Sequence, residues 1–184
     1  MRGAVKQNMP YQFVVCFSVV LACTATAFGG APQNKLELSV TIVIGEHSRD
    51  SNSTATTLTV SSTALTYEQT YQGARSDRHK PVKKEYRLTK HDREELSRLL
   101  KEKNLLVTAT ISHPPRQKGY SRYFELSVSP RLNGKESTIS IEAFPGDTDL
   151  KTDRLYQGSV SLIQELYKFI TRTDPDITAP SLID

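Results

Sequence analysis

Apolar residues alternate with polar ones in the segment KLELSVTIVIGEH, residues 35–47. The apolar positions are Leu36, Leu38, Val40, Ile42 and Ile44. Because successive side chains of a strand point to opposite faces of a sheet, this period of two predicts a strand with one buried face. The polar segment SRDSNST then leads to ATTLTVSSTALTYEQTY, which is rich in β-branched residues. We expect the two runs to form a hairpin, with Leu58, Val60 and Tyr67 facing inward.

A second hairpin is predicted near residues 122–144, where SRYFELSVSPRLNGKESTISIEAF contains two alternating runs. Asn133-Gly134 lies between them, and both residues readily adopt the positive φ angles that a tight hairpin turn requires. Tyr86-Arg87-Leu88 ends a short strand upstream, and LLVTATISH, which precedes Pro114-Pro115, is predicted as a strand or an extended segment.

The run TKHDREELSRLLKEKN, residues 89–104, has the pattern of an amphipathic helix. Thr89 stands at the position of an N-cap and Asp92 follows three residues later, as in a capping box. The apolar stripe consists of Leu96, Leu99 and Leu100. We expect Glu94 to pair with Arg98 and Asn104 to end the helix in a left-handed turn.

A final helix is predicted from about Asp153 to Arg172, ending before Pro175. Its core side consists of Leu155, Ser159, Leu162, Ile163, Leu166, Phe169 and Ile170, flanked by Tyr156 and Tyr167. Residues 174–184 are expected to form a loose C-terminal tail.

The order of these elements predicts an α+β fold, a mostly antiparallel sheet with two helices packed on one face. Strands come in groups joined as hairpins, and the helices follow those groups. The predicted organisation is therefore a leader at residues 1–31, one α+β domain at 32–173 and the tail.

The leader has the order of a secretory signal peptide. Arg2 and Lys6 precede an apolar run from about Phe13 to Cys23, and small residues follow through Ala31. A membrane-spanning helix needs about 20 apolar residues, and this run is about half as long. We therefore predict an exported protein, located in the periplasm, the cell envelope or the extracellular space.

Two kinds of cleavage fit the leader. Ala25-Thr26-Ala27 and Gly29-Gly30-Ala31 both have the small-x-small pattern of ordinary signal cleavage. The stretch VVLAC also resembles a bacterial lipobox, which implies a lipid on Cys23 and makes the protein a lipoprotein held at the membrane only through that lipid. The sequence leaves both alternatives open.

Composition restricts the partners of the mature domain. The formal net charge is +4, and loss of Arg2 and Lys6 with the leader lowers it by two, to +2. Its basic residues gather in RSDRHKPVKK and PPRQKGYSR, which have the composition of loops, so we expect no nucleic acid partner. Both cysteines, Cys16 and Cys23, lie in the leader, which leaves no disulfide in the mature domain and favours a bacterial origin.

The run EYRLTKHDREELSRLLKEKNL, followed by YFELSV and a helix, resembles small uncharacterised secreted bacterial domains. It is also similar to emfourin-type inhibitors of thermolysin-like metalloproteases. The resemblance lies in the order of elements from about Leu36 to Ile170. It implies a compact α+β protein without an active site, and it implies a secreted protease inhibitor as one alternative function. No inhibitory residue of that family corresponds to a position here.

The chain contains no HExxH, CxxC or GxSxG motif and no glycine-rich phosphate loop. Its four histidines, His47, His79, His91 and His113, stand far apart in sequence. Asp147, Asp149 and Asp153 could supply oxygen ligands to calcium, but the segment GDTDLKTD lacks the closing glutamate of an EF-hand, so we predict helix capping. We therefore assign no catalytic, cofactor-binding or metal-binding residue.

These observations predict an exported binding or interaction domain without catalytic activity. Its partner is expected to be a protein or another envelope component. The alternative to a binding domain or inhibitor is an exported hydrolase whose site is assembled from scattered residues, with Asp147, Asp149 and His113 as candidates.

Overall fold

The predicted alternating segments form the sheet of the folded domain. A computed structural model of the 184-residue chain describes residues 35–46, 52–73, 76–113, 122–144 and 147–180. The predicted leader with Cys23, His47 and residues 181–184 of the predicted tail lie outside the described residues.

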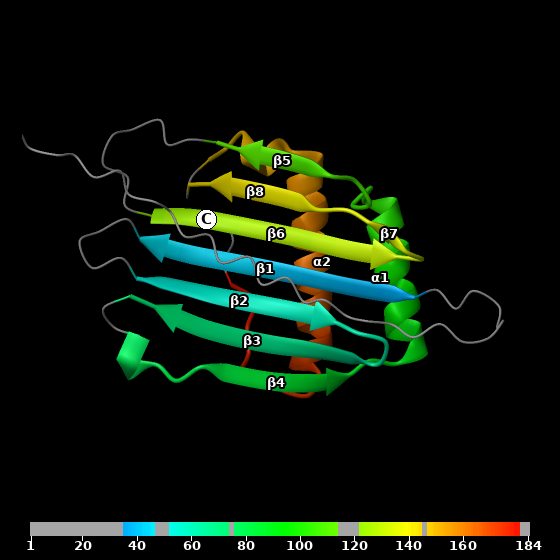
Figure 1. Cartoon of the computed structure of the whole chain (residues 1–184), viewed down its shortest axis with the longest axis horizontal. Helices are drawn as coiled ribbons and strands as arrows, with labels where there is room; N and C mark the ends of the chain where they lie inside the picture. The colour runs from blue at the N-terminus through cyan, green and yellow to red at the C-terminus, as the bar shows by residue number, and fades with distance from the viewer. Residues whose placement is uncertain (1–34, 47–51, 74–75, 114–121, 145–146, 181–184) are drawn as a thin grey trace, which may run out of the picture. The chain divides into compact units, whose positions relative to one another are not determined.

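Within the described residues, eight strands form one sheet, which Figure 1 shows face on. They are β1 (Leu36–Glu46), β2 (Ser53–Val60), β3 (Ala64–Gln72), β4 (Val82–Arg87), β5 (Ala109–Ser112), β6 (Arg122–Leu132), β7 (Lys135–Glu136) and β8 (Ile139–Ala143). The strand order is β4-β3-β2-β1-β6-β8-β5, with the short β7 paired to β6. Neighbouring strands are antiparallel, apart from the parallel pair of β5 and β8.

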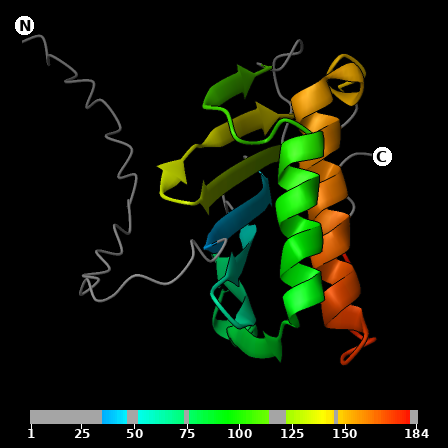
Figure 2. The same ribbon diagram turned by 90° about the vertical axis from the view of Figure 1, so that its right-hand side faces the viewer.

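Two helices, α1 (Lys90–Glu102) and α2 (Arg154–Thr171), pack side by side against one face of this sheet (Figure 2). Helix α1 carries the chain from β4 at one edge of the sheet to β5 at the other edge. Two 3-10 turns, η1 (Ser76–Arg78) and η2 (Leu150–Thr152), complete the regular elements of the described residues. The predicted α+β class, with a mostly antiparallel sheet and both helices on one face, is confirmed.

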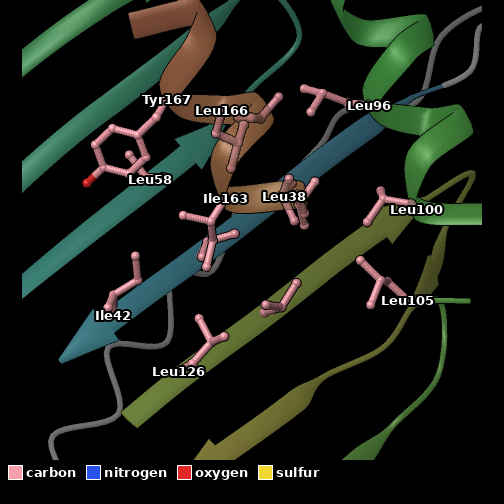
Figure 3. Close-up of a cluster of buried hydrophobic side chains, with 14 of the residues drawn as sticks. Leu38, Ile42, Leu58, Leu96, Leu100, Leu105, Leu126, Ile163, Leu166 and Tyr167 are labelled. Atoms are coloured by element: carbon pink, nitrogen blue, oxygen red, sulfur yellow. The ribbon is translucent and has the colours of Figure 1, made fainter. Parts of the chain in front are cut away.

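The hydrophobic core lies between the helices and the covered face of the sheet (Figure 3). Leu38, Ile42 and Leu126 from the strands meet Leu100 and Leu166 from the helices, and all five are buried. The predicted inward positions of β1 are therefore confirmed as far as Ile42.

Ile44 is the exception among the predicted inward residues of β1, because it is 37% exposed. In Figure 1 this end of β1 extends past both helices, which fits the exposure. Alternation predicts which face a residue occupies but not how far the covering layer reaches.

Helix α1 begins and ends as predicted. Thr89 Oγ1 accepts a hydrogen bond from Asp92 N at 3.1 Å, and the Asp92 carboxylate accepts one from Thr89 N at 2.8 Å, which completes the capping box. At the other end Asn104 has φ 54°, and the backbone N–H of Leu105 donates to the carbonyl of Leu100 at 2.8 Å. This C-terminal arrangement is a Schellman motif.

The two helices run antiparallel and contact each other at both ends. Arg172, after the end of α2, donates to Asp92 at the start of α1, with 2.9 Å between Nη1 and Oδ1. At the opposite end, a Cβ atom on Gly158 would lie 3.1 Å from side-chain atoms of Lys103 and Leu105. Glycine at position 158 therefore lets α2 approach the end of α1 closely.

The predicted hairpin at Asn133-Gly134 is confirmed, with φ 53° and 83° at the two residues. The prediction of one strand across ATTLTVSSTALTYEQTY is wrong, because the chain turns between β2 and β3. Ser61 N donates to the carbonyl of Ala64 at 2.8 Å to close this turn. The turn contains no glycine, proline, asparagine or aspartate, and its signal rests on Ser61 and Ser62, whose hydroxyls are weaker turn formers.

Two local predictions also need correction. Arg98 contacts Glu95 at 3.8 Å and Glu102 at 3.7 Å, whereas Glu94 contacts Lys90, so the predicted Glu94–Arg98 pair does not form. The first part of the predicted loose tail is attached to the domain. Asp174 accepts hydrogen bonds from Lys84 and Tyr86 of β4, and Ile177 packs against the core.

Candidate binding surface on the open face of the sheet

The middle of the sheet face opposite the helices is lined by serine and threonine, with charged residues around it. Alternation places these hydroxyls on the open face, because their neighbours along each strand fill the core. Register aligns them in two adjacent rows across the strands. The first row is Thr66, Thr59, Ser39 and Ser129, and the second is Thr57, Thr41, Ser127, Ser140 and Thr110. We call these the hydroxyl rows.

The hydroxyl rows form a regular array. Strands lie about 4.8 Å apart, and residues two positions apart on a strand are separated by about 6.7 Å. Thr41 and Thr57, neighbours in the second row, have their hydroxyl oxygens 3.5 Å apart. Strands β1, β2 and β6 are each paired on both sides, so their backbone groups are used within the sheet. A partner on this part of the face must therefore be recognised by side chains.

A cavity of about 550 Å³ adjoins the first hydroxyl row, at the end of the sheet where β1 begins and β2 and β6 end. Ser39, Thr59 and Ser129 belong both to the row and to the lining of this cavity. We call it the β1–β2–β6 cavity. Because it shares these three residues with the row, the cavity and the hydroxyl rows form one continuous polar surface.

Four charged residues at the β1–β2–β6 cavity neutralise one another. Lys35 Nζ lies 2.9 Å from Glu37 Oε1, and Arg131 lies between Glu37 and Glu136, at 3.5 Å from Nη1 to Oε2 and 3.1 Å from Nε to Oε1. The hydrogen bond from Lys35 is the main cause that holds the pKa of Glu37 below its usual value; burial opposes it, and the charges of Lys35 and Arg131 add to the lowering. Two cations and two anions leave the lining without net charge.

Ser137 lines this cavity, and its side-chain hydroxyl is buried. The residue is 6% exposed, and among the described residues its Oγ has no hydrogen-bond partner. Its backbone N–H donates to the carbonyl of Pro130 at 3.1 Å, which holds it beside β6. A buried polar atom without a partner is uncommon in folded proteins and costs free energy.

The structure brings together two of the three residues considered for hydrolysis. His113, directly after β5, has its Nδ1 atom 2.7 Å from Asp147 Oδ2, and the other oxygen of Asp147 accepts backbone N–H bonds from Asp149 and Leu150. Burial opposes the charge of Asp147, but the N–H of Leu150 and the imidazole of His113 outweigh it and lower the pKa of the carboxyl group. A carboxylate at Nδ1 favours the tautomer in which Nε2 is the basic nitrogen.

Other candidates have structural roles. Asp153 is the N-cap of α2, accepting from Tyr156 N at 2.9 Å, so the predicted capping role is confirmed. His79 stacks on Tyr71 with 4.5 Å between ring centroids, and His91 is exposed in the first turn of α1. Within the part of the chain that the structure describes, no group of three or more His, Cys, Asp or Glu residues is placed to hold a metal ion.

Comparisons with known proteins add no relationship: no protein-family model matches the chain, and no curated protein matches it. The resemblance to emfourin-type inhibitors therefore stays a prediction. None of the helices in the described ranges is long and apolar enough to span a membrane.

Sequence reasoning missed the β1–β2–β6 cavity. Its lining comes from segments about 100 residues apart, such as Lys35 and Arg131, which only strand register brings together. One signal was present in the sequence. The polar positions of β1, β2 and β6 are mostly serine and threonine.

Proposed function

We propose that this protein is an exported binding domain of the cell envelope and that the open face of its sheet contacts the partner. The observation that carries the proposal is the continuous polar surface of the hydroxyl rows and the β1–β2–β6 cavity. Hydroxyl groups can both donate and accept hydrogen bonds, and they are held here on a paired sheet supported by the helices. Such a surface is preorganised, so little conformational entropy is lost when a partner binds.

The leader supports the export part of the proposal. Arg2 and Lys6 precede the apolar run at 13–23, and small residues follow it. Export is tested by expressing the full chain in a bacterium and sequencing the N-terminus of the recovered protein. We expect a chain shortened by about 20–30 residues, the length of a signal peptide. Recovery of intact Met1 would contradict export.

Detergent partitioning of the protein expressed in the same cells distinguishes the two cleavage alternatives. Lipidation requires the thiol of Cys23. If the protein is secreted without a lipid, Cys23→Ala should not change its detergent partitioning. If Cys23 carries a lipid, the parent chain should enter the detergent phase and the variant should not. Partitioning that survives the substitution would exclude the lipoprotein alternative.

The chemistry of the cavity lining favours binding over catalysis. Its two carboxylates, Glu37 and Glu136, both contact cations. A general base needs a partly protonatable group near neutral pH, and the lowered pKa of Glu37 takes it further from that range. The groups at this site are therefore better suited to hydrogen bonding than to proton transfer.

Binding by the open face is tested by co-sedimentation of the processed protein with isolated envelopes of its native host. Thr59→Glu/Ser127→Glu places charge on two strands of the hydroxyl rows. Gln164→Glu/Thr173→Glu places two carboxylates at exposed positions on the helix side and is the matched control. We expect the first variant to lose at least tenfold in retention, about 1.4 kcal/mol, and the control to match the parent. Equal retention of both variants would contradict the proposal.

One observation favours a second function, hydrolysis: the His113–Asp147 pair has the arrangement of a general base and its orienting carboxylate. In this function, His113 would activate water for attack on an ester or amide. The test is a panel of ester and peptide substrates with His113→Gln and, as control, His79→Gln. Activity that is lost only in the first variant would support hydrolysis, and activity unaffected by it would exclude this site.

A further inference from the structure

We infer that the β1–β2–β6 cavity, continued by the hydroxyl rows, binds a neutral glycan chain. This inference names the class of partner for the surface described above and rests on the proposed function. It follows from three features of the site, namely its balanced charge, the chemistry of its hydroxyls and the pairing of its backbone.

The balanced charge selects against ionic partners. Glu37 contacts both Lys35 and Arg131, and Arg131 also contacts Glu136, so each charge at the cavity already has an opposite charge beside it. A polyanion would have to displace a carboxylate from its cation, and a polycation would have to displace a cation. A partner without charge can instead accept hydrogen bonds from the cations and donate to the carboxylates while the ion pairs stay in place.

The hydroxyls select a partner that donates and accepts at the same atom. Ser39, Thr59 and Ser129 can each act in either direction, which matches the hydroxyl groups of sugars. Ser137 also lines the cavity, and its Oγ has no partner among the described residues; because this oxygen is closed off from solvent, only a ligand that displaces the atoms around it would supply one. A ligand that supplied this hydrogen bond would remove a cost that the unliganded domain carries.

Because β1, β2 and β6 are paired on both sides, an extended peptide cannot bind to them as an added strand. Peptides that add to a sheet bind through an unpaired strand edge, whereas β1, β2 and β6 are interior strands. Apolar residues in the lining do not provide anchors either, because Leu38 and Val60 are 2% and 1% exposed and belong to the core. Recognition by many hydroxyls without an apolar anchor predicts that affinity increases with the length of the glycan.

The inference is tested by titrating the processed full-length domain with cellohexaose, chitohexaose and maltohexaose, using NMR and calorimetry. At least one of these hexasaccharides should bind saturably at concentrations below about 10 mM, a range typical of weak complexes, and should bind more tightly than its disaccharide. Backbone signals of Ser39, Thr59, Ser129 and Ser137 should shift most. A sulfated oligosaccharide should bind more weakly than the neutral one.

The variant Ser39→Ala/Ser129→Ala should raise the Kd for the bound hexasaccharide at least tenfold. Its matched control, Ser161→Ala/Thr173→Ala on the helix side, should leave that Kd unchanged within twofold. Absence of saturable binding by all three hexasaccharides would overturn the inference, as would an unchanged Kd in the first variant or preferential binding of the sulfated chain.

Co-sedimentation with envelopes separates this inference from the proposed function. If envelopes retain the protein through the open face and no hexasaccharide binds, the glycan inference is wrong and the binding function stands. If a hexasaccharide binds at the cavity and envelopes do not retain the protein, the glycan inference stands and the envelope function is wrong.

Discussion

The two faces of the sheet are built from the same strands but differ in chemistry and in what covers them. On the helix side, residues such as Val40, Leu58 and Val128 are fully buried under α1 and α2. On the other side, their neighbours Thr41, Thr57 and Ser127 form a row of hydroxyls. Threonine favours strands through its β-branched shape, so these positions can support the sheet without contributing to the core.

This difference predicts that residues which stabilise the fold are distinct from those of the proposed binding surface. Burial of apolar area supplies most of the folding free energy, and that area lies on the covered face. Changes on the open face should therefore alter recognition with little effect on folding, and changes on the covered face should do the reverse. Substitutions on the two faces test this separation.

Leu166→Ala is expected to cause the largest loss of stability. Leu166 is fully buried in α2 among core side chains, so truncation removes buried methyl groups and leaves a cavity, at a cost of about 2–5 kcal/mol. Glu95→Ala on α1 and Thr41→Ala on the open face should each cost under about 1 kcal/mol. Urea denaturation of the three variants measures this contrast. Equal midpoints would mean that the covered face does not carry the stability.

Asp92→Asn is expected to have the next largest effect. Its carboxylate, with a side chain 6% exposed, accepts hydrogen bonds from Thr89 and Arg172 and so connects the start of α1 to the end of α2. Loss of the charge should lower the free energy of unfolding by about 1–3 kcal/mol. A double-mutant cycle with Arg172→Met should show coupling between the two residues, and strictly additive effects would contradict the connection.

Acid should lower the free energy of unfolding of the domain. Burial raises the pKa of Asp92, but hydrogen bonds from Thr89 and Arg172 outweigh it, so the folded-state pKa lies below the unfolded value of about 3.9. The unfolded state then binds the proton more readily, and the stability that the carboxylate provides at neutral pH is lost as pH falls below about 4. Asp147, whose pKa is also lowered, acts in the same direction.

Urea midpoints measured from pH 7 to pH 3 test this pH dependence. The parent domain should lose stability across the acid range, and Asp92→Asn should lose less because its amide does not titrate. A parallel fall in both proteins would show that the charge of Asp92 does not contribute.

The smallest effect is expected for Thr59→Val on the open face. Threonine and valine have similar shapes, and Thr59 is exposed, so the free energy of unfolding should change by no more than about 0.5 kcal/mol. The same variant removes a hydroxyl from the cavity lining and should weaken binding. A large loss of stability would show that the hydroxyl rows are part of the folding core after all.

Local patterns predicted much of the fold because local physics determines those elements. The alternation in β1, the capping box at Thr89 and Asp92, and the turn at Asn133-Gly134 all involve residues close in sequence. The turn after Val60 was missed because the serine and threonine residues that form it also continue the composition of the flanking strands. The parallel pairing of β5 with β8 was also missed, because it depends on where α1 crosses the sheet.

The candidate site was less predictable than the fold. His113 and Asp147 were considered from sequence, but their contact depends on the ends of two distant segments. The β1–β2–β6 cavity depends on the register between β1 and β6, which aligns Glu37 with Arg131 and Ser39 with Ser129. Alternation indicates that these residues share a face, but only the register places them beside one another.

The most direct test of the open face as the binding surface is methyl NMR of the processed domain with labelled threonine, recorded with and without isolated envelopes. Thr41, Thr57, Thr59 and Thr66 report on the hydroxyl rows, and Thr152 and Thr171 report on regions outside that face. We expect the first four methyl signals to shift or broaden while the other two stay unchanged. Changes confined to Thr152 and Thr171, or no change in any signal, would contradict the account.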